Sequence, residues 1–143
     1  MIVYRERVLP SISNLVLPVL LFPSVWAVML PIDAPLALPV AAFLTFGFVA
    51  LIFLSAPVVL VSETELSARG ATIQRKLLGE ITLVPKSQQF NELGTKLNAR
   101  AWLSIQASVK GMVKVEINDP SDPTPYWLIS TRNPEKLKRV LSN

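Results

Sequence analysis

The chain has 143 residues, of which 51% are hydrophobic and 17% charged, and its mean hydropathy is +0.46. This composition is too apolar and too weakly charged for an ordinary soluble domain. The absence of Cys and His excludes disulfides, zinc and iron–sulfur sites, thiol catalysis and any catalytic triad that uses His.

Charge is distributed unevenly along the chain. Of its 14 Lys and Arg and 10 Asp and Glu residues, only Arg5, Glu6, Arg7 and Asp33 precede residue 63. About 20 helical residues cross a hydrocarbon core of about 30 Å. We therefore predict a cytoplasmic N-terminus at 1–7 and a transmembrane hairpin at 8–61, followed by a separate domain at 62–143. The two predicted spans cover about 8–30 and 36–60.

Asp33 supports the division into two spans, because a carboxylate at the middle of a bilayer costs about 2.5–3.5 kcal/mol on insertion scales. It lies between Pro31 and Pro35, in a segment typical of a turn in water. Pro18 and Pro23 interrupt the first span, which leaves a re-entrant hairpin open as an alternative to a complete crossing. No charged residue lies at membrane depth to indicate a transport path.

Cationic residues lie only at the outer ends of the predicted hairpin. Arg5 and Arg7 precede the first span, whereas Arg69, Arg75 and Lys76 follow the second. The positive-inside rule therefore predicts a multi-pass protein of the cell (inner or plasma) membrane with both termini in the cytoplasm. The alternative of a cleaved signal peptide over residues 1–30 is disfavoured, because the apolar stretch exceeds the usual 7–15 residues.

The second half of the chain has the alternation typical of strands. We predict a hairpin around Gly70 (64–69 and 71–77), a strand at 80–84, a second hairpin through Lys110 and Gly111 (102–109 and 113–117), and a strand at 126–131. The spacing of Phe90, Leu93 and Leu97 predicts a short helix over 86–97.

The last predicted element is a helix. Asn133 is the expected N-cap, Pro134 is the first helical residue, and Leu137, Val140 and Leu141 form the apolar stripe. The predicted fold class is an α+β membrane protein. It has a two-helix transmembrane hairpin followed by a small antiparallel β domain, a pleckstrin-homology-like (PH-like) partly open barrel with a C-terminal capping helix.

A loop rich in Pro and Asp precedes the strand at 126–131. We interpret Asp119 and Asp122 as turn residues whose side chains accept hydrogen bonds from nearby backbone N–H groups. A carboxylate pair for metal or acid–base chemistry is the disfavoured alternative, because no third ligand is apparent. Tyr126 and Trp127 point to opposite faces of a strand, so we expect one in the core and the other available to an interface or partner.

The loop and the strand after it carry a family resemblance. Together with Arg5-Glu6-Arg7 ahead of a two-span hairpin, residues 115–137 resemble the actinobacterial membrane family known as domain of unknown function 3093. The residues that carry the motif are Asp119, Pro120, Asp122, Pro123, Pro125, Tyr126, Trp127, Thr131 and Pro134. The resemblance covers essentially the whole chain. It implies a two-span protein with a cytoplasmic domain in a Gram-positive, high-GC bacterium, and it carries over no activity.

We predict a non-enzymatic interaction or scaffold module, or an accessory subunit of a membrane complex, with the lipid bilayer and a membrane-proximal protein as partners. Only residues 61–63 separate the second predicted span from the first predicted strand, which keeps the domain beside the membrane. No sequence motif marks a catalytic, cofactor or metal site, so no cofactor is expected and an enzyme or transporter component lacks support.

Binding of anionic lipid headgroups or small anions is the alternative function. The candidate lipid or partner surface consists of Arg69, Arg75, Lys76, Lys136, Lys138, Arg139 and Trp127. Solvated charges that only orient the protein are the simpler interpretation of these cations. Nucleic-acid binding is disfavoured, because the basic residues are interleaved with acidic ones and form no continuous stripe.

Overall fold

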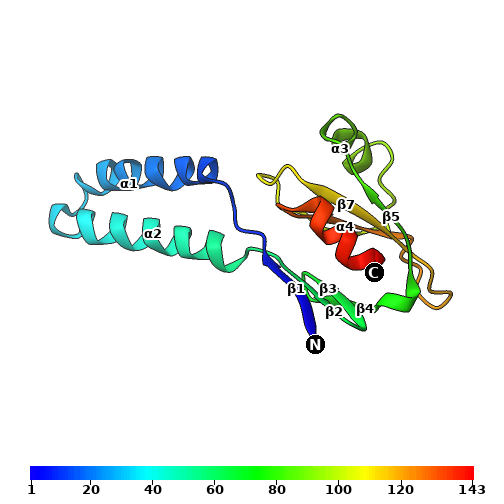
Figure 1. The fold of residues 1–143 in the computed structure, drawn as a ribbon. Helices are drawn as coiled ribbons and strands as arrows, with labels where there is room; N and C mark the ends of the chain where they lie inside the picture. The colour runs from blue at the N-terminus through cyan, green and yellow to red at the C-terminus, as the bar shows by residue number, and fades with distance from the viewer. The chain divides into compact units, whose positions relative to one another are not determined.

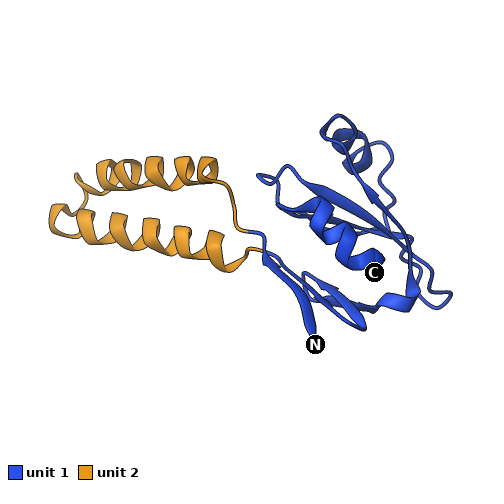
Figure 2. Ribbon diagram, viewed as in Figure 1, with its two compact units in different colours: residues 1–8, 57–143 blue, residues 9–56 orange.

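The structure, a computed structural model, describes all 143 residues and divides into two compact units (Figures 1 and 2). The larger unit contains residues 1–8 and 57–143, and the smaller unit, residues 9–56, is inserted into it. The predicted boundary at residue 62 is therefore wrong. The predicted N-terminal segment outside the domain is also wrong, because residues 1–8 belong to the larger unit.

The smaller unit is a helical hairpin. A short 3-10 helix, η1 (Ile12–Leu15), leads into α1 (Val16–Met29), and α2 (Ala34–Leu54) follows the turn. Asp33 lies in that turn as predicted and caps α2, because its Oδ1 accepts a hydrogen bond from the Leu36 N–H at 3.1 Å. The helix α2 ends at Leu54, six residues before the predicted end of the span at 60, because the chain beyond Pro57 pairs as a strand.

Both helices of the hairpin are apolar on every side. Only Pro18 of α1 and Ala37 and Ala41 of α2 are buried within the structure. Large side chains such as Leu17 and Phe43 are exposed, at 69% and 77%. The segments Ile12–Met29 and Ala34–Leu54 are long and apolar enough to cross a membrane.

The larger unit begins with an antiparallel sheet in the order β1-β2-β3-β4. Its strands are β1 (Ile2–Arg7), β2 (Val58–Ser62), β3 (Glu65–Ala68) and β4 (Ala71–Gln74). The predicted hairpin around Gly70 is confirmed. Arg69 and Gly70 both have positive φ, 51° and 87°, as a two-residue type I′ turn requires. The strand β4 ends at Gln74, and the 3-10 helix η2 (Arg75–Leu77) follows it.

The second sheet has the order β5-β7-β8-β6. Its strands are β5 (Leu78–Leu83), β6 (Trp102–Ser104), β7 (Met112–Ile117) and β8 (Tyr126–Ser130). The strand β6 pairs with β8 and is parallel to it, so the predicted hairpin of 102–109 with 113–117 is wrong. All other strand pairs are antiparallel, as predicted for the domain. The hairpin does not form because the segment 102–109 crosses from one face of the second sheet to the other. Leu103 and Ile105 pack on one face of the sheet, whereas Val109 packs on the other.

The second sheet is covered on both faces. One hydrophobic cluster fills the space between the two sheets and includes Leu66, Val115 and Ile129, all fully buried. A second cluster on the opposite face contains Met112 and Leu128, and it is covered by the chain around α3 (Lys86–Leu93). All five residues of β8 are buried for this reason.

The helix α3 is shorter than the predicted helix over 86–97. It ends at Leu93, before Gly94, and of the predicted stripe only Leu93 and Leu97 pack against the sheet. Phe90 is 84% exposed, so its predicted place in the stripe is wrong. The buried Glu92 holds α3 on the sheet instead, because its Oε2 lies 3.0 Å from Lys114 Nζ of β7.

The C-terminal helix α4 (Pro134–Ser142) packs against β1, β5 and β7 and closes the space between the two sheets (Figure 1). Leu137 and Leu141 are buried as predicted, with Val140 partly buried beside them. Asn133 is the N-cap residue, as predicted, although its side chain makes no capping hydrogen bond.

The last carbonyl groups of α4 accept hydrogen bonds from Arg75, a residue of η2. Nη2 of Arg75 donates to the carbonyls of Val140 at 2.6 Å and Leu141 at 3.2 Å, and its Nη1 donates to the Ser62 carbonyl at 3.3 Å. The last carbonyls of a helix have no partner within the helix. The guanidinium therefore joins α4 to η2 and to the end of β2.

The N-terminal strand is fixed by a carboxylate on the inner face of the first sheet. Glu6 Oε2 accepts hydrogen bonds from the Tyr4 hydroxyl and from Thr131 Oγ1, both at 2.5 Å. Glu6 Oε1 accepts from the Arg132 N–H at 2.7 Å. Burial, together with the Glu6 carboxylate, raises the pKa of Tyr4 to about 12. These bonds link β1 to the turn between β8 and α4.

We expect Arg75→Met to lower the free energy of unfolding of the domain by about 1–2 kcal/mol, because it removes charge-assisted hydrogen bonds to half-buried carbonyls. Lys76→Met is the matched control. It removes a neighbouring exposed cation and should change stability by less than about 0.5 kcal/mol. Chemical unfolding of the detergent-solubilised chain, followed by near-UV circular dichroism, measures both effects. Equal losses in the two variants would contradict the capping role.

The pKa of Tyr4 predicts a loss of stability at alkaline pH. Because its pKa is about 12 in the folded state against 10.0 in the unfolded chain, the neutral phenol stabilises the fold below pH 10. That contribution is lost as the pH rises from 10 to about 12. The stability gap between the wild type and Tyr4→Phe should therefore narrow over this interval. In Glu6→Gln, phenolate absorbance should show a lower pKa for Tyr4 than in the wild type. A constant gap would count against the assigned pKa.

Candidate functional site

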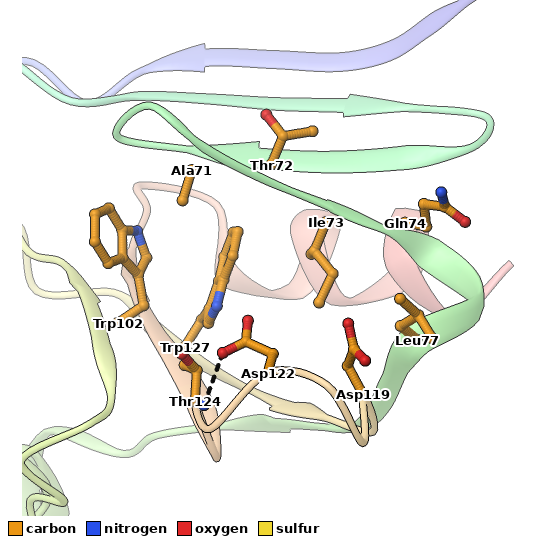
Figure 3. A pocket seen from close by; sticks show the side chains of 10 residues that line it. All are labelled: Ala71, Thr72, Ile73, Gln74, Leu77, Trp102, Asp119, Asp122, Thr124 and Trp127. Carbon is orange, nitrogen blue, oxygen red and sulfur yellow. Dashed lines mark hydrogen bonds between the residues drawn. The ribbon is translucent and has the colours of Figure 1, made fainter.

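The candidate site is an open pocket of about 340 Å³ between β4 and the loop that joins β7 to β8 (Figure 3). It lies wholly within the larger unit. We call it the tryptophan–aspartate pocket. It is lined by Ala71, Thr72, Ile73, Gln74, Leu77, Trp102, Asp119, Asp122, Thr124 and Trp127.

Two tryptophans form one end of the pocket. The ring centroids of Trp102 and Trp127 lie 6.4 Å apart with an angle of 48° between the ring planes. Trp102 is held in place by its indole Nε1, which donates to the Ala68 carbonyl at 3.1 Å and so connects β6 to β3. The exposed fraction is 38% for Trp102 and 3% for Trp127. Trp102 therefore presents aromatic surface to solvent, while Trp127 supports it from the core.

Two carboxylates lie on the loop side of the pocket and point toward β4 (Figure 3). Asp119 Oδ1 accepts from the N–H and the hydroxyl of Ser121, at 2.9 and 2.6 Å. Asp122 Oδ1 accepts from the Thr124 N–H at 2.8 Å. The prediction that both side chains bond nearby backbone N–H groups is thus confirmed.

Each carboxylate keeps binding capacity beyond its turn. The hydrogen bonds use only Oδ1, so Oδ2 of Asp119 and Oδ2 of Asp122 have no partner, and neither residue takes part in a salt bridge. The hydrogen bonds from the side chain and backbone of Ser121 lower the pKa of Asp119, which favours its charged form at neutral pH. The loop therefore presents two anionic groups that no cation of the chain neutralises.

The opposite wall of the pocket is the free edge of a sheet. The strand β4 is the last of its sheet and pairs only with β3. In this hairpin Ala71 and Ile73 are the residues that exchange hydrogen bonds with β3, since pairs alternate along an antiparallel ladder. The N–H and C=O groups of Thr72 and Gln74 consequently face the open edge, and both residues line the pocket.

The basic residues of the predicted surface lie in the β3–β4 turn, in η2 and on α4. Arg69 lies in the β3–β4 turn, Arg75 is occupied by the carbonyls of α4, and Lys76 lies beside it in η2. The other cations are on α4: Lys136, Lys138 and Arg139. Lys136 Nζ lies 5.8 Å from the centre of the Tyr4 ring. Trp127 is buried, so its predicted place on a lipid-contacting surface is wrong, because β8 is covered on both faces.

The family-motif residues have distinct structural places. Pro120, Pro123 and Pro125 lie in the loop, and the Pro125 carbonyl accepts from the Ile117 N–H at 3.0 Å. Tyr126 and Trp127 point to opposite faces, as predicted, but both are buried, because each face carries its own hydrophobic cluster. Thr131 binds Glu6, and the Pro134 ring together with the Thr131 carbonyl approaches Gly111 so closely that a Cβ at residue 111 would clash.

Several residues that line the pocket carry no signal in the sequence. Thr72 and Gln74 are unremarkable polar residues, and only their position on an edge strand gives them a role. The alternation after Trp102 predicts that a strand begins there but does not indicate which strand it pairs with. Tyr4 and Glu6 carried no signal, because the segment that contains them pairs with a strand more than 50 residues away in sequence.

Residues 3–141 match the family described as protein of unknown function (DUF3093), so the chain belongs to this family. No curated protein and no solved structure matches the chain. The structure contains no group of three or more acidic, His or Cys residues that could hold a metal ion.

Proposed function

We propose that this protein is anchored in the cell membrane by residues 9–56 and that its larger unit binds a partner protein, as an interaction module or accessory subunit of a membrane complex. The observation that carries the proposal is the surface of the hairpin. Its two helices are apolar on all sides, and only 6% and 11% of their candidate spans are buried within the chain. Such helices need an apolar environment, which a bilayer supplies.

The chain's path supports an anchor with both termini on one side, which is the cytoplasmic side by the distribution of Lys and Arg. The chain leaves the larger unit after Val8 and returns at Pro57. The Val8 N–H donates to the Pro57 carbonyl at 2.9 Å, so these two positions are adjacent. The hairpin therefore begins and ends at one place, and both termini belong to the same unit.

A binding role without chemistry fits the larger unit. Its polar clusters are structural, since Glu6 and Glu92 each bind groups of neighbouring elements, and its open pocket presents charge and aromatic surface. Two sheets closed by a C-terminal helix fit the proposed PH-like layout, and the parallel pair of β6 and β8 departs from it. The non-enzymatic role and the actinobacterial origin are parts of the same proposal.

Affinity purification tests the proposal. The tagged full chain should remain with membranes after alkaline carbonate washing, because its helices require lipid. In mild detergent, it should then co-purify with a stoichiometric partner protein. Cross-linking before solubilisation and a tagged unrelated two-span protein as control exclude adventitious capture. Release by carbonate would contradict the anchor, and purification only as a free monomer would contradict the partner.

Anionic lipid or small-anion binding is the second candidate, and the observation that favours it is a hollow lined by Arg132, Lys136 and Arg139 at the start of α4. Each cation near a charged membrane contributes about 1 kcal/mol. If this function is correct, the full chain in neutral nanodiscs should bind vesicles more strongly as their anionic lipid content rises, and less strongly as salt is added. Lys136→Gln with Arg139→Gln should weaken that binding. Binding that is indifferent to lipid charge and salt would contradict this candidate.

A further inference from the structure

We propose that the tryptophan–aspartate pocket and the free edge of β4 form one binding site for an extended protein segment that carries a basic side chain. The segment would pair with β4 as an additional strand and place a Lys or Arg side chain between the indole of Trp102 and the carboxylates of Asp119 and Asp122. This inference rests on the proposed function as an interaction module and specifies the chemistry of the partner.

The first support is the geometry of the edge. Thr72 and Gln74 present unpaired backbone donors and acceptors toward the pocket, which is the arrangement that binds peptides by strand addition. Side chains of an added strand would alternate between the two faces of the sheet. Those on the inner face would continue the row formed by Ala71 and Ile73, whose side chains point into the pocket (Figure 3).

The second support is charge. An inward-facing side chain would meet the loop from which Asp119 and Asp122 point toward β4 (Figure 3). The Oδ2 atoms of both residues lack partners, so they can accept hydrogen bonds from a cation without disturbing the turn bonds made by Oδ1. The edge strand β4 carries no charge of its own, and the only charged residues that line the pocket are Asp119 and Asp122.

The third support is the aromatic wall. Trp102 lines the pocket and is 38% exposed, its indole donates to the Ala68 carbonyl, and its ring centroid lies 6.4 Å from that of Trp127. Cations stack favourably on a Trp face, and guanidinium does so most often. A pocket lined by an indole and by two carboxylates therefore favours a basic side chain over an acidic or a purely apolar one.

A lipid amine would offer the same positive charge but would leave the backbone groups of β4 unpaired. A protein segment satisfies the edge, the carboxylates and the indole together. The structure thus favours a protein segment over an ethanolamine headgroup, and binding experiments can separate the two sources.

The direct test uses the full chain in neutral nanodiscs and a capped peptide of alternating threonine and valine with a central arginine. A Trp26→Phe background leaves Trp102 and Trp127 as the only tryptophans. Arginine peptide should alter the tryptophan emission and bind saturably. The same peptide with glutamate in place of arginine should bind at least tenfold more weakly. No saturable binding of the arginine peptide would overturn the proposal.

Variants of the chain locate the site. Asp119→Asn and Asp122→Asn keep the Oδ1 acceptor of each turn and should each weaken binding about threefold, or about tenfold together, as expected for partly exposed charge pairs. Glu80→Gln, which removes an exposed carboxylate from β5, is the matched control and should leave binding unchanged. Equal effects of Glu80→Gln and the pocket variants would overturn the proposal, because binding would then reflect only the overall charge.

A separate experiment tests whether the bound segment pairs with β4 as an added strand. Thr72→Pro removes one edge donor at a position that an edge strand tolerates, and it should weaken binding, whereas Thr72→Val should not. If Thr72→Pro perturbs folding, backbone N-methylation of the peptide removes the same hydrogen bonds from the ligand side. An N-methylated peptide that binds as well as its parent would overturn the strand addition. Binding of ethanolamine-lipid vesicles that depends on both aspartates, without peptide binding, would assign the site to lipid instead.

Failure of this binding site can be distinguished from failure of the proposed interaction role. A partner that co-purifies equally with the wild type and with the doubly substituted Asp119→Asn and Asp122→Asn chain would leave the interaction role intact and overturn this site. Specific peptide binding by a chain that captures no partner would support the site and contradict the proposed complex.

Discussion

The pairing of β1 with β2 is the constraint on which the rest of this structure depends. These strands lie on either side of the hairpin in sequence, and their register joins Tyr4 to Val61 and Arg7 to Val58. Because the pairing continues to the point where Val8 meets Pro57, the insertion of residues 9–56 must start and finish at the same place. Glu6 then ties β1 to the turn before α4. One β ladder thus joins the N-terminal strand to the first sheet, and Glu6 connects that sheet to the turn before the C-terminal helix.

The charged residues of the domain differ in what they bind. Arg75 and Glu92 are half-buried or buried, and each satisfies groups of a distant element, so both are structural. Asp119 and Asp122 satisfy their own loop with one oxygen and leave the other free beside an aromatic wall. The two aspartates of the pocket therefore have their turns completed by one oxygen each and keep the second oxygen without a partner.

Local signals predicted several elements correctly. The hairpin around Gly70, the helix that starts at Pro134, and the side-chain turns of Asp119 and Asp122 depend on neighbouring residues only. Longer-range features were predicted poorly. The alternation in 102–109 is compatible with a hairpin, but the segment changes faces after Ile105 and β6 joins β8 in parallel. The pocket combines β4, β6 and a distant loop, so no local pattern could predict it.

The sequence by itself determined that two uncharged apolar helices meet at Asp33, because the cost of burying a carboxylate and the length of a helix are local quantities. It also determined the family, through the motif that runs from Asp119 to Pro134. Only the tertiary structure decided that residues 2–7 are a strand of the domain and that Trp102 and two aspartates share a pocket with an open strand edge. Strand partners and pocket walls are chosen by contacts between segments far apart in the chain, and those contacts form only when the two sheets close around their common core.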